Sequence, residues 1–456
     1  MSTDDVFDVA VIGMGIVGIA TAYYLATQRG ITKIALIDRD QPMGFTSAQS
    51  GENYRNWWPH PAMVAFTDRS IDLMEAIARE SENAIKMTRR GYVLATREAS
   101  IDDLVTQLHD GLGDRAKHLL RYHEKGSCAS YVAPEKPDWE SAPDGVDILR
   151  DRDLIRRIFP SLDPLVRNII HIRRGGDISS QQLGMLMLSH LVSVGAKRLI
   201  AEVDGIAHPH QYHLHLKAEG GPHTLQAEKL VNAAGPFANR IADMLGVDLP
   251  IHNTFQQKIA FEDRSRAIPR NLPFSIDLDG QHIDWTDEER SLLLADSDHR
   301  WLAGDMPGAI HCRPDGGDRG TWIKLGWAFN EAPAETSWTP QLNDNFPDIV
   351  LRGAARLNPA LKTYYSRLPR SAHHYGGWYT MTDENWPLIG PMGPDGAFMN
   401  CAFSGYGTMA ACAAGELCAA WIDGGELPNY APMFSFERYK DDALLKKLAA
   451  SNKGVL

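Results

Sequence analysis

The chain has 456 residues, a formal net charge of −12, 44% hydrophobic residues and 23% charged residues. This composition is typical of a globular protein in water, and the length exceeds what one ordinary hydrophobic core supports, so we expect two domains. The acidic balance and the lack of a basic run longer than Arg173-Arg174 or Lys446-Lys447 argue against a nucleic-acid partner.

The cysteines and the N-terminal segment indicate the cellular compartment in which the protein is expected. The five cysteines, at 128, 312, 401, 412 and 418, are odd in number and form no C-x-x-C motif, which is typical of thiols kept reduced. Residues 1–8 are acidic and lead directly into an apolar run without the pattern of a signal peptide. No stretch of eighteen apolar residues occurs. We therefore expect a cytoplasmic protein with no membrane partner.

A glycine-rich turn near the N-terminus is the most informative motif. The sequence Gly-Met-Gly-Ile-Val-Gly at 13–18 follows the apolar run 9–12 and opens a periodic stretch, 19–28, that Gly30 can end. A second apolar run, 33–37, leads to Asp38, twenty residues after Gly18. This order is the dinucleotide-binding fingerprint, in which helix N–H groups face the pyrophosphate and the acid binds ribose hydroxyls. The charge of Asp38 would repel a 2′-phosphate, which argues against NADP.

Later segments predict further parts of the same domain. The runs 199–203 and 212–216 alternate like the strands of a hairpin, and 230–236 predicts a buried strand that ends in a turn of small residues. Residues 397–403 predict a strand, 404–407 a turn and 408–422 an Ala-rich helix that Gly424 ends. The N-terminus of that helix is placed to face a second ligand group, such as a flavin pyrimidine ring.

Six short motifs follow one another over nearly the whole chain. They are the fingerprint with Asp38-Arg39, Thr-Ser-Ala-Gln-Ser-Gly at 46–51, Val-Asn-Ala-Ala-Gly at 231–235, Lys-Leu-Gly at 324–326, Thr-Met-Thr-Asp at 380–383 and Ser-Gly-Tyr-Gly at 404–407. In this order the chain resembles the flavoprotein superfamily of D-amino-acid oxidase, glycine oxidase, sarcosine oxidase and dimethylglycine dehydrogenase. The resemblance implies FAD as the cofactor.

The resemblance also implies an α/β fold with two domains. One is a Rossmann-like FAD-binding domain, discontinuous and of the GR2 type, and the other is an α+β substrate domain built on an antiparallel sheet that roofs the flavin. The family pattern and the strand signals place the FAD-binding domain at 1–88, 146–240 and 378–440. They place the substrate domain at 89–145 and 241–377. Residues 127–145 are expected to form a surface loop, 285–298 a solvated helix or lid, and the tail 441–456 a last helix followed by disorder.

The resemblance assigns FAD contacts to residues from several parts of the chain. They are Gly13, Met14, Gly15, Ile16, Val17, Gly18, Asp38, Arg39, Thr46, Ser47, Ser50, Gly51, Val203, Ala234, Gly235, Gly405, Tyr406, Gly407, Thr408 and Met409. Family members that tether FAD use a histidine near 46–51 or a cysteine just before the Thr-x-Thr-Asp stretch. This chain has neither, so we expect noncovalent FAD. No pattern of metal ligands occurs, so no metal is implied.

Lys324 lies in the strand-like run 321–327, on the same face as Trp322 and Gly326. One interpretation is an edge-strand lysine that discourages aggregation. The resemblance implies another: in sarcosine oxidase the corresponding lysine sits over the flavin N5 through a water and helps dioxygen accept an electron. A cation there stabilises developing superoxide, so we expect dioxygen as the acceptor.

The family's carboxylate-binding residues are replaced in this chain. A sarcosine-oxidase lysine after the last Gly-x-Gly corresponds to Met409, a glycine-oxidase arginine to Tyr379, and the histidine four residues after the family lysine to Ala328. Other groups must therefore hold the acid end of a substrate.

Arg55 is our first candidate, because it directly follows the flavin-contacting segment and a guanidinium can bind a carboxylate bidentately. The alternative is a surface arginine stacked on Trp57 or Trp58. Lys258 and Arg313 are further candidates, unless they are solvated or belong to structural ion pairs.

His311 occupies roughly the place of an active-site tyrosine in sarcosine oxidase, and His373 and His374 lie near the expected flavin face. A histidine there can take the amine proton or bond the substrate carboxylate. Most of the seventeen histidines do neither. The expected catalytic set is Lys324, Arg55, His311, Tyr379 and Lys258.

These features predict an FAD enzyme that removes a hydride from the carbon next to a secondary amine, giving an imine that hydrolyses. Amino acids substituted on nitrogen, including sarcosine-, glycine- and iminodiacetate-like compounds, fit best as substrates. Because the chain offers several cationic candidates, a substrate with more than one carboxylate would also suit the site. Three alternatives stay open. They are an NAD-dependent dehydrogenase, which would be colourless, a flavin dehydrogenase with another acceptor, and a flavoprotein binding or assembly factor without turnover.

Overall fold

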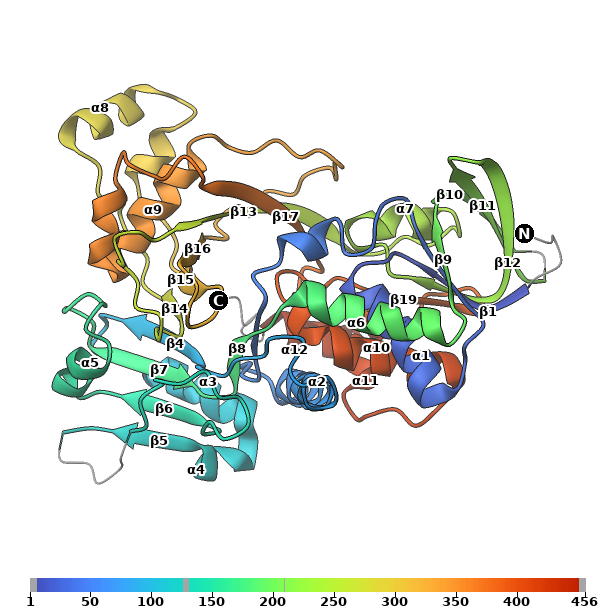
Figure 1. The fold of residues 1–456 in the computed structure, drawn as a ribbon, viewed down its shortest axis with the longest axis horizontal. Helices are drawn as coiled ribbons and strands as arrows, with labels where there is room; N and C mark the ends of the chain where they lie inside the picture. Colours follow the sequence, from blue (N-terminus) through green and yellow to red (C-terminus); the bar gives the residue numbers. More distant parts are fainter. Residues whose placement is uncertain (1–5, 126–130, 209, 451–456) are drawn as a thin grey trace.

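The computed structural model describes residues 6–125, 131–208 and 210–450. The chain forms two large sheets that lie beside each other, each with its own helices (Figure 1). The eight-stranded sheet has the order β10-β11-β12-β1-β2-β9, with β19 paired to β12 and β18 to β19. Its strands are β1 Val6–Ile12, β2 Ile34–Asp38, β9 Lys197–Ile200, β10 Glu202–Ala207, β11 Tyr212–Ala218, β12 Gly221–Asn232, β18 Leu388–Pro391 and β19 Ala397–Cys401.

The centre of this sheet is parallel, so the carboxyl ends of β12, β1 and β2 meet at one edge. Gly13 follows β1 there with φ 113°, and a Cβ on it would lie 2.2 Å from the Ala233 carbonyl oxygen, so the turn requires glycine. Helix α1 (Ile16–Arg29) begins three residues later and ends at Gly30, which has φ 69°. The predicted strand, turn, helix and second strand are therefore all present.

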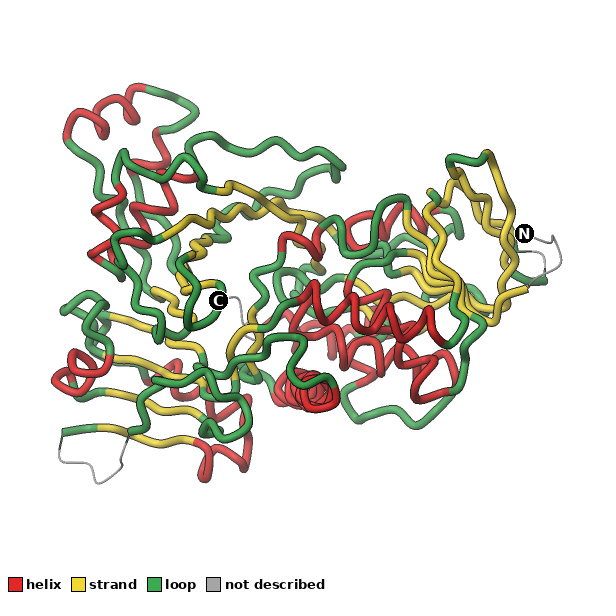
Figure 2. Tube along the Cα trace, in the orientation of Figure 1, coloured by secondary structure: helices red, strands yellow, loops and turns green. Residues whose placement is uncertain are grey.

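Four helices form a layer against this sheet. Helix α1 packs against α10 (Gly407–Asp423) and α6 (Ser180–Ser193), and α10 packs against α2 (Pro61–Glu80). Figure 2 shows these helices gathered below the strands. The predicted Ala-rich helix is α10, whose buried small side chains allow close approach to α1. The C-terminal segment adds α11 (Ala431–Phe434) and α12 (Asp442–Ala450), and residues 451–456, where disorder was expected, lie outside the described residues.

The nine-stranded sheet has the order β17-β13-β16-β15-β14-β4-β7-β6-β5 and is mostly antiparallel. Its strands are β4 Tyr92–Thr96, β5 Leu120–His123, β6 Val146–Leu149, β7 Asn168–Ile172, β13 His252–Glu262, β14 Phe274–Asp277, β15 Ile310–Asp315, β16 Trp322–Gly326 and β17 His373–Met381. A short ribbon of β3 (Asn53–Arg55) and β8 (Gly175–Asp177) lies apart from both sheets. The remaining helices are α3 Asp102–Leu112, α4 Ala116–Leu119, α5 Arg152–Ile158, α7 Ala238–Asp243, α8 Asp287–Ala295 and α9 Phe346–Leu357.

The strand pairing corrects the boundary expected at residue 146. The segment 146–172 was expected in the FAD-binding domain, but β6 and β7 pair with each other and β7 pairs with β4, all within the nine-stranded sheet. The reason is that the alternation of a strand does not specify which sheet it joins. The part of the chain that the structure describes contains no helix long and apolar enough to span a membrane. Helix α8 is exposed, as expected for 285–298, and the start of the expected loop 127–145 lies outside the described residues.

Candidate functional site

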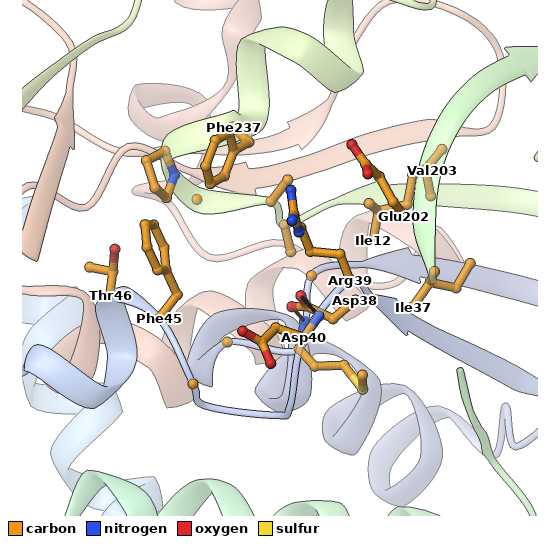
Figure 3. Close-up of a pocket in the computed structure, with 18 of the residues that line it drawn as sticks. Ile12, Ile37, Asp38, Arg39, Asp40, Phe45, Thr46, Glu202, Val203 and Phe237 are labelled. Atoms are coloured by element: carbon orange, nitrogen blue, oxygen red, sulfur yellow. Dashed lines mark hydrogen bonds between the residues drawn. The ribbon is translucent and has the colours of Figure 1, made fainter. Parts of the chain in front are cut away.

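A cavity opens where β1, β2 and β12 end (Figure 3). Asp38, at the end of β2, is one of its lining residues. One Asp38 carboxylate oxygen accepts the Met14 N–H at 2.7 Å and the other accepts the Asp40 N–H at 3.1 Å. Burial raises the pKa of Asp38 and these hydrogen bonds oppose the rise. The glycine-rich turn thus holds the carboxylate at the cavity wall, where ribose hydroxyls can reach it.

Three aromatic side chains line the same cavity. Phe45 and Phe237 lie together opposite Asp38 in Figure 3. Trp338 stacks on Phe237 with ring centroids 4.0 Å apart, and the Arg39 guanidinium lies 4.3 Å from the Trp338 ring centroid. Trp338 belongs to the segment between β16 and α9. This aromatic group was not predicted from the sequence, because a tryptophan in a long polar loop carries no local signal.

A second cavity continues from the first. The two share lining residues around the fingerprint turn, among them Gly15, Thr46, Ser47 and Gly235, so together they form one elongated site. Thr46 lines both cavities, and its hydroxyl is buried without a hydrogen-bond partner among the described residues. The Ser47 hydroxyl accepts the Ile16 N–H of α1 at 3.0 Å. An orphaned buried hydroxyl beside a helix N-terminus fits a polar ligand group such as a pyrophosphate.

Most of the cofactor residues named from the sequence line this elongated site. They are Gly13, Met14, Gly15, Ile16, Val17, Asp38, Arg39, Thr46, Ser47, Ser50, Gly51, Val203, Ala234, Gly235, Gly405, Gly407 and Thr408. Ser50 and Thr408, 358 residues apart in the chain, share a hydrogen bond of 2.8 Å between their hydroxyls.

Gly18, Tyr406 and Met409 do not line either cavity. Gly18 instead allows α1 to approach the turn, because a Cβ there would lie 2.0 Å from the Gly13 carbonyl oxygen. Tyr406 turns its hydroxyl to the Asn385 carbonyl and packs on Trp58, and Met409 is buried in the core. The packing of α10 sets the positions of the Tyr406 and Met409 side chains, and the sequence motif alone does not specify that packing.

The nine-stranded sheet contributes the far end of the site. On β13, β16 and β15, the residues Lys258, Gly326 and His311 stand opposite one another in register. Lys324 and Arg313 form the neighbouring row of this face. Opposed residues of antiparallel strands point to the same side, so these charged groups share one face.

Lys258 lines the second cavity and is 7% exposed. Its Nζ donates to the Gln49 carbonyl oxygen at 3.2 Å and lies 5.7 Å from the Tyr379 ring centroid. Tyr379 also lines the cavity, and its ring lies close against Gly405. The structure therefore brings Lys258 and Tyr379 together, as two members of the expected catalytic set.

Lys324 has a different environment. Its Nζ lies 2.9 Å from the Glu52 carboxylate and 3.4 Å from that of Asp315. Arg313 joins the same cluster, 2.8 Å from Asp315, and its Nη2 also donates to the Gly51 carbonyl oxygen at 3.0 Å. Arg313 is thus part of a structural ion-pair cluster, which was one of the two interpretations left open. The role expected for Lys324 with dioxygen stays a prediction.

Arg55 is buried at 3% exposure, so it is not a surface residue. Its guanidinium carbon lies 5.1 Å from the Trp58 ring centroid and 5.7 Å from those of Trp57 and Tyr92. The stacking that the alternative interpretation described is present, but inside the protein. Burial lowers the pKa of Arg55 to about 10, so the guanidinium stays charged at neutral pH.

Aromatic contacts connect Arg55 to His311. Tyr92 packs on Phe274 with centroids 4.4 Å apart, and Phe274 packs on the His311 ring at 5.0 Å. Burial and the nearby charge of Lys258 lower the pKa of His311 to about 3, so the imidazole is neutral at pH 7.

The other two candidate histidines lie apart from the cavity lining. His373 is exposed and stacks on Tyr375, and His374 stacks on Phe346 and bonds the Gln257 side chain. Among residues 6–125, 131–208 and 210–450, no three His, Cys, Asp or Glu side chains are grouped as a metal site.

Comparisons with known proteins agree on the family. The model of the FAD dependent oxidoreductase family, DAO, matches residues 8–421. The sarcosine oxidase subunit beta of Rhodobacter capsulatus is 19% identical over 457 residues, covering 98% of this chain and 91% of that protein. The corresponding subunit of Rhizobium meliloti is 24% identical over 264 residues, 56% of each chain.

Solved structures share the fold over nearly the whole chain. The L-proline dehydrogenase of P. horikoshii has a TM-score of 0.70 at 20% identity, covering 96% of this chain and 98% of that one. The glycine oxidase of Geobacillus kaustophilus has a TM-score of 0.69 at 17% identity, covering 95% and 98%. The iminodiacetate oxidase of Chelativorans sp. has a TM-score of 0.66 at 16% identity, covering 94% and 98%. With a site shaped for a dinucleotide and a family model that matches most of its length, the chain belongs to the FAD-dependent oxidoreductases of the DAO family.

Proposed function

We propose that the protein oxidises a secondary amine or an amino acid substituted on nitrogen, with FAD as hydride acceptor and dioxygen as the final acceptor. One observation carries the proposal. The elongated site has a carboxylate, Asp38, at its nucleotide end and a buried cation, Lys258, in the wall of its other end. A second buried cation, Arg55, lines neither cavity and connects to His311 through the rings of Tyr92 and Phe274. The Asp38 carboxylate suits a ribose, and the cations Lys258 and Arg55 suit a substrate with one or more carboxylates.

Arg55 is proposed to bind the substrate carboxylate. Its guanidinium is charged and enclosed by Trp57, Trp58 and Tyr92, which exclude water and so strengthen a pairing with an anion. The aromatic pair of Tyr92 and Phe274 then lies between the carboxylate site and His311.

His311 is a poor proton acceptor for an ammonium group, because its pKa is lowered to about 3. We therefore propose that His311 hydrogen-bonds the substrate as a neutral imidazole. The positive charge of Lys258 and Arg55 disfavours an ammonium in the site and favours the neutral amine, whose lone pair assists loss of the adjacent hydride. The amine proton would leave to water as the substrate binds.

FAD binding is proposed to be noncovalent. Gln49 and Gly377 both line the second cavity and lie in contact, since a Cβ on Gly377 would fall 3.2 Å from that of Gln49. Neither residue carries a group that can bond covalently to the flavin. Cys401 also lines the cavity, but burial raises the pKa of its thiol to about 12, which keeps it a weak nucleophile.

An anaerobic screen tests the proposal. Purified protein is mixed with N-methyl, N-carboxymethyl, cyclic and primary amino acids, and bleaching of the flavin absorption is followed, then admission of dioxygen. We expect a yellow protein that N-substituted amino acids reduce and dioxygen reoxidises. A colourless protein would support an NAD enzyme, slow reoxidation a dehydrogenase with another acceptor, and a flavin that no amine reduces a binding or assembly factor.

A further inference from the structure

Two lysines share the sheet face at the cavity, and their charges are balanced differently. Lys324 belongs to a cluster with Arg313, Glu52 and Asp315, in which two cations meet two carboxylates. The Nζ of Lys324 lies 2.9 Å from Glu52. The net charge of this cluster is therefore zero, and the field it projects into the cavity is weak.

No carboxylate among the described residues balances the charge of Lys258. It is 7% exposed, and no ion pair with it is present in the described part of the chain. Its one hydrogen bond in that part of the chain goes to a neutral acceptor, the Gln49 carbonyl oxygen. A buried ammonium without a counter-ion is costly, so a protein retains one where an anion or a developing negative charge compensates it.

The residues next to Lys258 on the sheet supply no counter-ion. In register beside it stand Gly326 of β16 and Tyr375 of β17, and His311 follows on β15. The groups in register or in contact with it are uncharged: Gly326, His311, Tyr375, Tyr379 and the Gln49 carbonyl. The neighbouring row of Lys324 and Arg313 is balanced by Glu52 and Asp315. Gly326 leaves space for the His311 ring, because a Cβ there would lie 2.3 Å from the His311 Nε2.

We propose that Lys258, rather than Lys324, supplies the positive charge that faces the flavin in this protein. The inference rests on the proposed function. A bound FAD would accept a hydride, that is two electrons and one proton, so its reduction would add one negative charge to the site. A fixed, uncompensated cation in the cavity wall stabilises that added charge, and the same cation stabilises superoxide when dioxygen takes an electron.

The test measures the midpoint potential of the bound flavin in the complete protein, with a chemical reductant and indicator dyes and without substrate. Lys258→Met removes the charge and keeps the length, and Lys258→Arg keeps the charge. The matched control is the double variant Lys324→Met with Glu52→Gln, which removes one cation and one anion from the neighbouring cluster. Visible spectra and thermal melts check that each variant is folded and holds flavin.

We expect Lys258→Met to lower the ratio of reduced to oxidised flavin at least tenfold at a given potential, which is about 30 mV for a two-electron couple. Lys258→Arg and the double variant should stay close to the wild-type potential. An unchanged potential in Lys258→Met, or an equal fall in the double variant, overturns the inference while leaving the proposed function intact. A chain that binds no flavin refutes the proposed function and this inference with it.

Discussion

The Asp38 carboxylate is the single side chain on which nucleotide binding most depends. Its two oxygens already accept the Met14 and Asp40 N–H groups, which fix its orientation, and lone pairs remain for ribose hydroxyls. We expect Asp38→Ala to weaken FAD binding ten- to a hundredfold, since hydrogen bonds to a charged group contribute about 1.5–3 kcal/mol. Titration of the apoprotein with FAD, followed by flavin fluorescence, measures the change. Equal retention of flavin by variant and wild type through dialysis would place Asp38 away from the ribose.

Arg55 offers a second test at this scale. Without its guanidinium a buried substrate carboxylate has no partner there, so Arg55→Ala is expected to lower kcat/KM for an acidic substrate roughly a hundredfold. FAD content should not change, because Arg55 does not line the cofactor cavity. The control is an amine without a carboxylate, which variant and wild type should oxidise equally. Unchanged kinetics on the acidic substrate would exclude Arg55 from this role and leave Lys258, Arg313 and the histidines to be replaced in turn.

Single residues also show what the sequence can and cannot predict. The fingerprint residues were predictable, because a glycine turn, a helix and an acid at fixed spacing specify their own geometry. The environment of Lys324 was not, because its partner Glu52 lies 272 residues away. The strand pattern gave the face on which Lys324 lies, but the ion pair that neutralises it depends on how the segment before β3 packs against the nine-stranded sheet.

Whole elements were predicted where their signals are local. Helix α10 and strands β1, β2 and β19 lie within a few residues of the expected ranges, because apolar periodicity and capping glycines mark them. Strands β6 and β7 were placed in the wrong domain, because pairing partners are non-local. The segment between β16 and α9 likewise has no periodic pattern, although it carries Trp338 to the nucleotide cavity.

Trp338 allows this segment to be tested. Its indole stacks on Phe237, packs on Phe45 and lies beside Arg39, so this segment between β16 and α9 closes one wall of the nucleotide cavity. We expect Trp338→Ala to release FAD several-fold faster, while Trp338→Phe retains most of the stacking and stays near wild type. Release is followed by the rise in flavin fluorescence after dilution to a protein concentration at which rebinding is negligible. Trp301, which is 43% exposed and not part of the cavity lining, supplies the control variant Trp301→Ala.

At the scale of the whole molecule, buried neutral histidines make folding stability depend on pH. His171 of β7 is fully buried, bonds the Arg90 carbonyl and the Tyr131 hydroxyl, and has its pKa lowered to about 3 by burial and by Arg173. In the unfolded chain its pKa returns to about 6.5. The unfolded state therefore binds more protons between these two values, and stability is lost as pH falls from about 6.5 towards 3.

From pH 7 to pH 5 this one group is expected to cost about 2 kcal/mol of unfolding free energy. The His171→Gln variant should lose correspondingly less unfolding free energy between pH 7 and pH 5. The comparison is between the slopes of unfolding free energy against pH, so it holds even if the variant is less stable at pH 7. Urea unfolding at both pH values measures it, and His118→Gln, which alters an exposed histidine, is the matched control. If His171→Gln and His118→Gln show the wild-type slope, the acid sensitivity of the fold arises elsewhere, and His311, which is also held neutral beside Lys258, is the next group to replace.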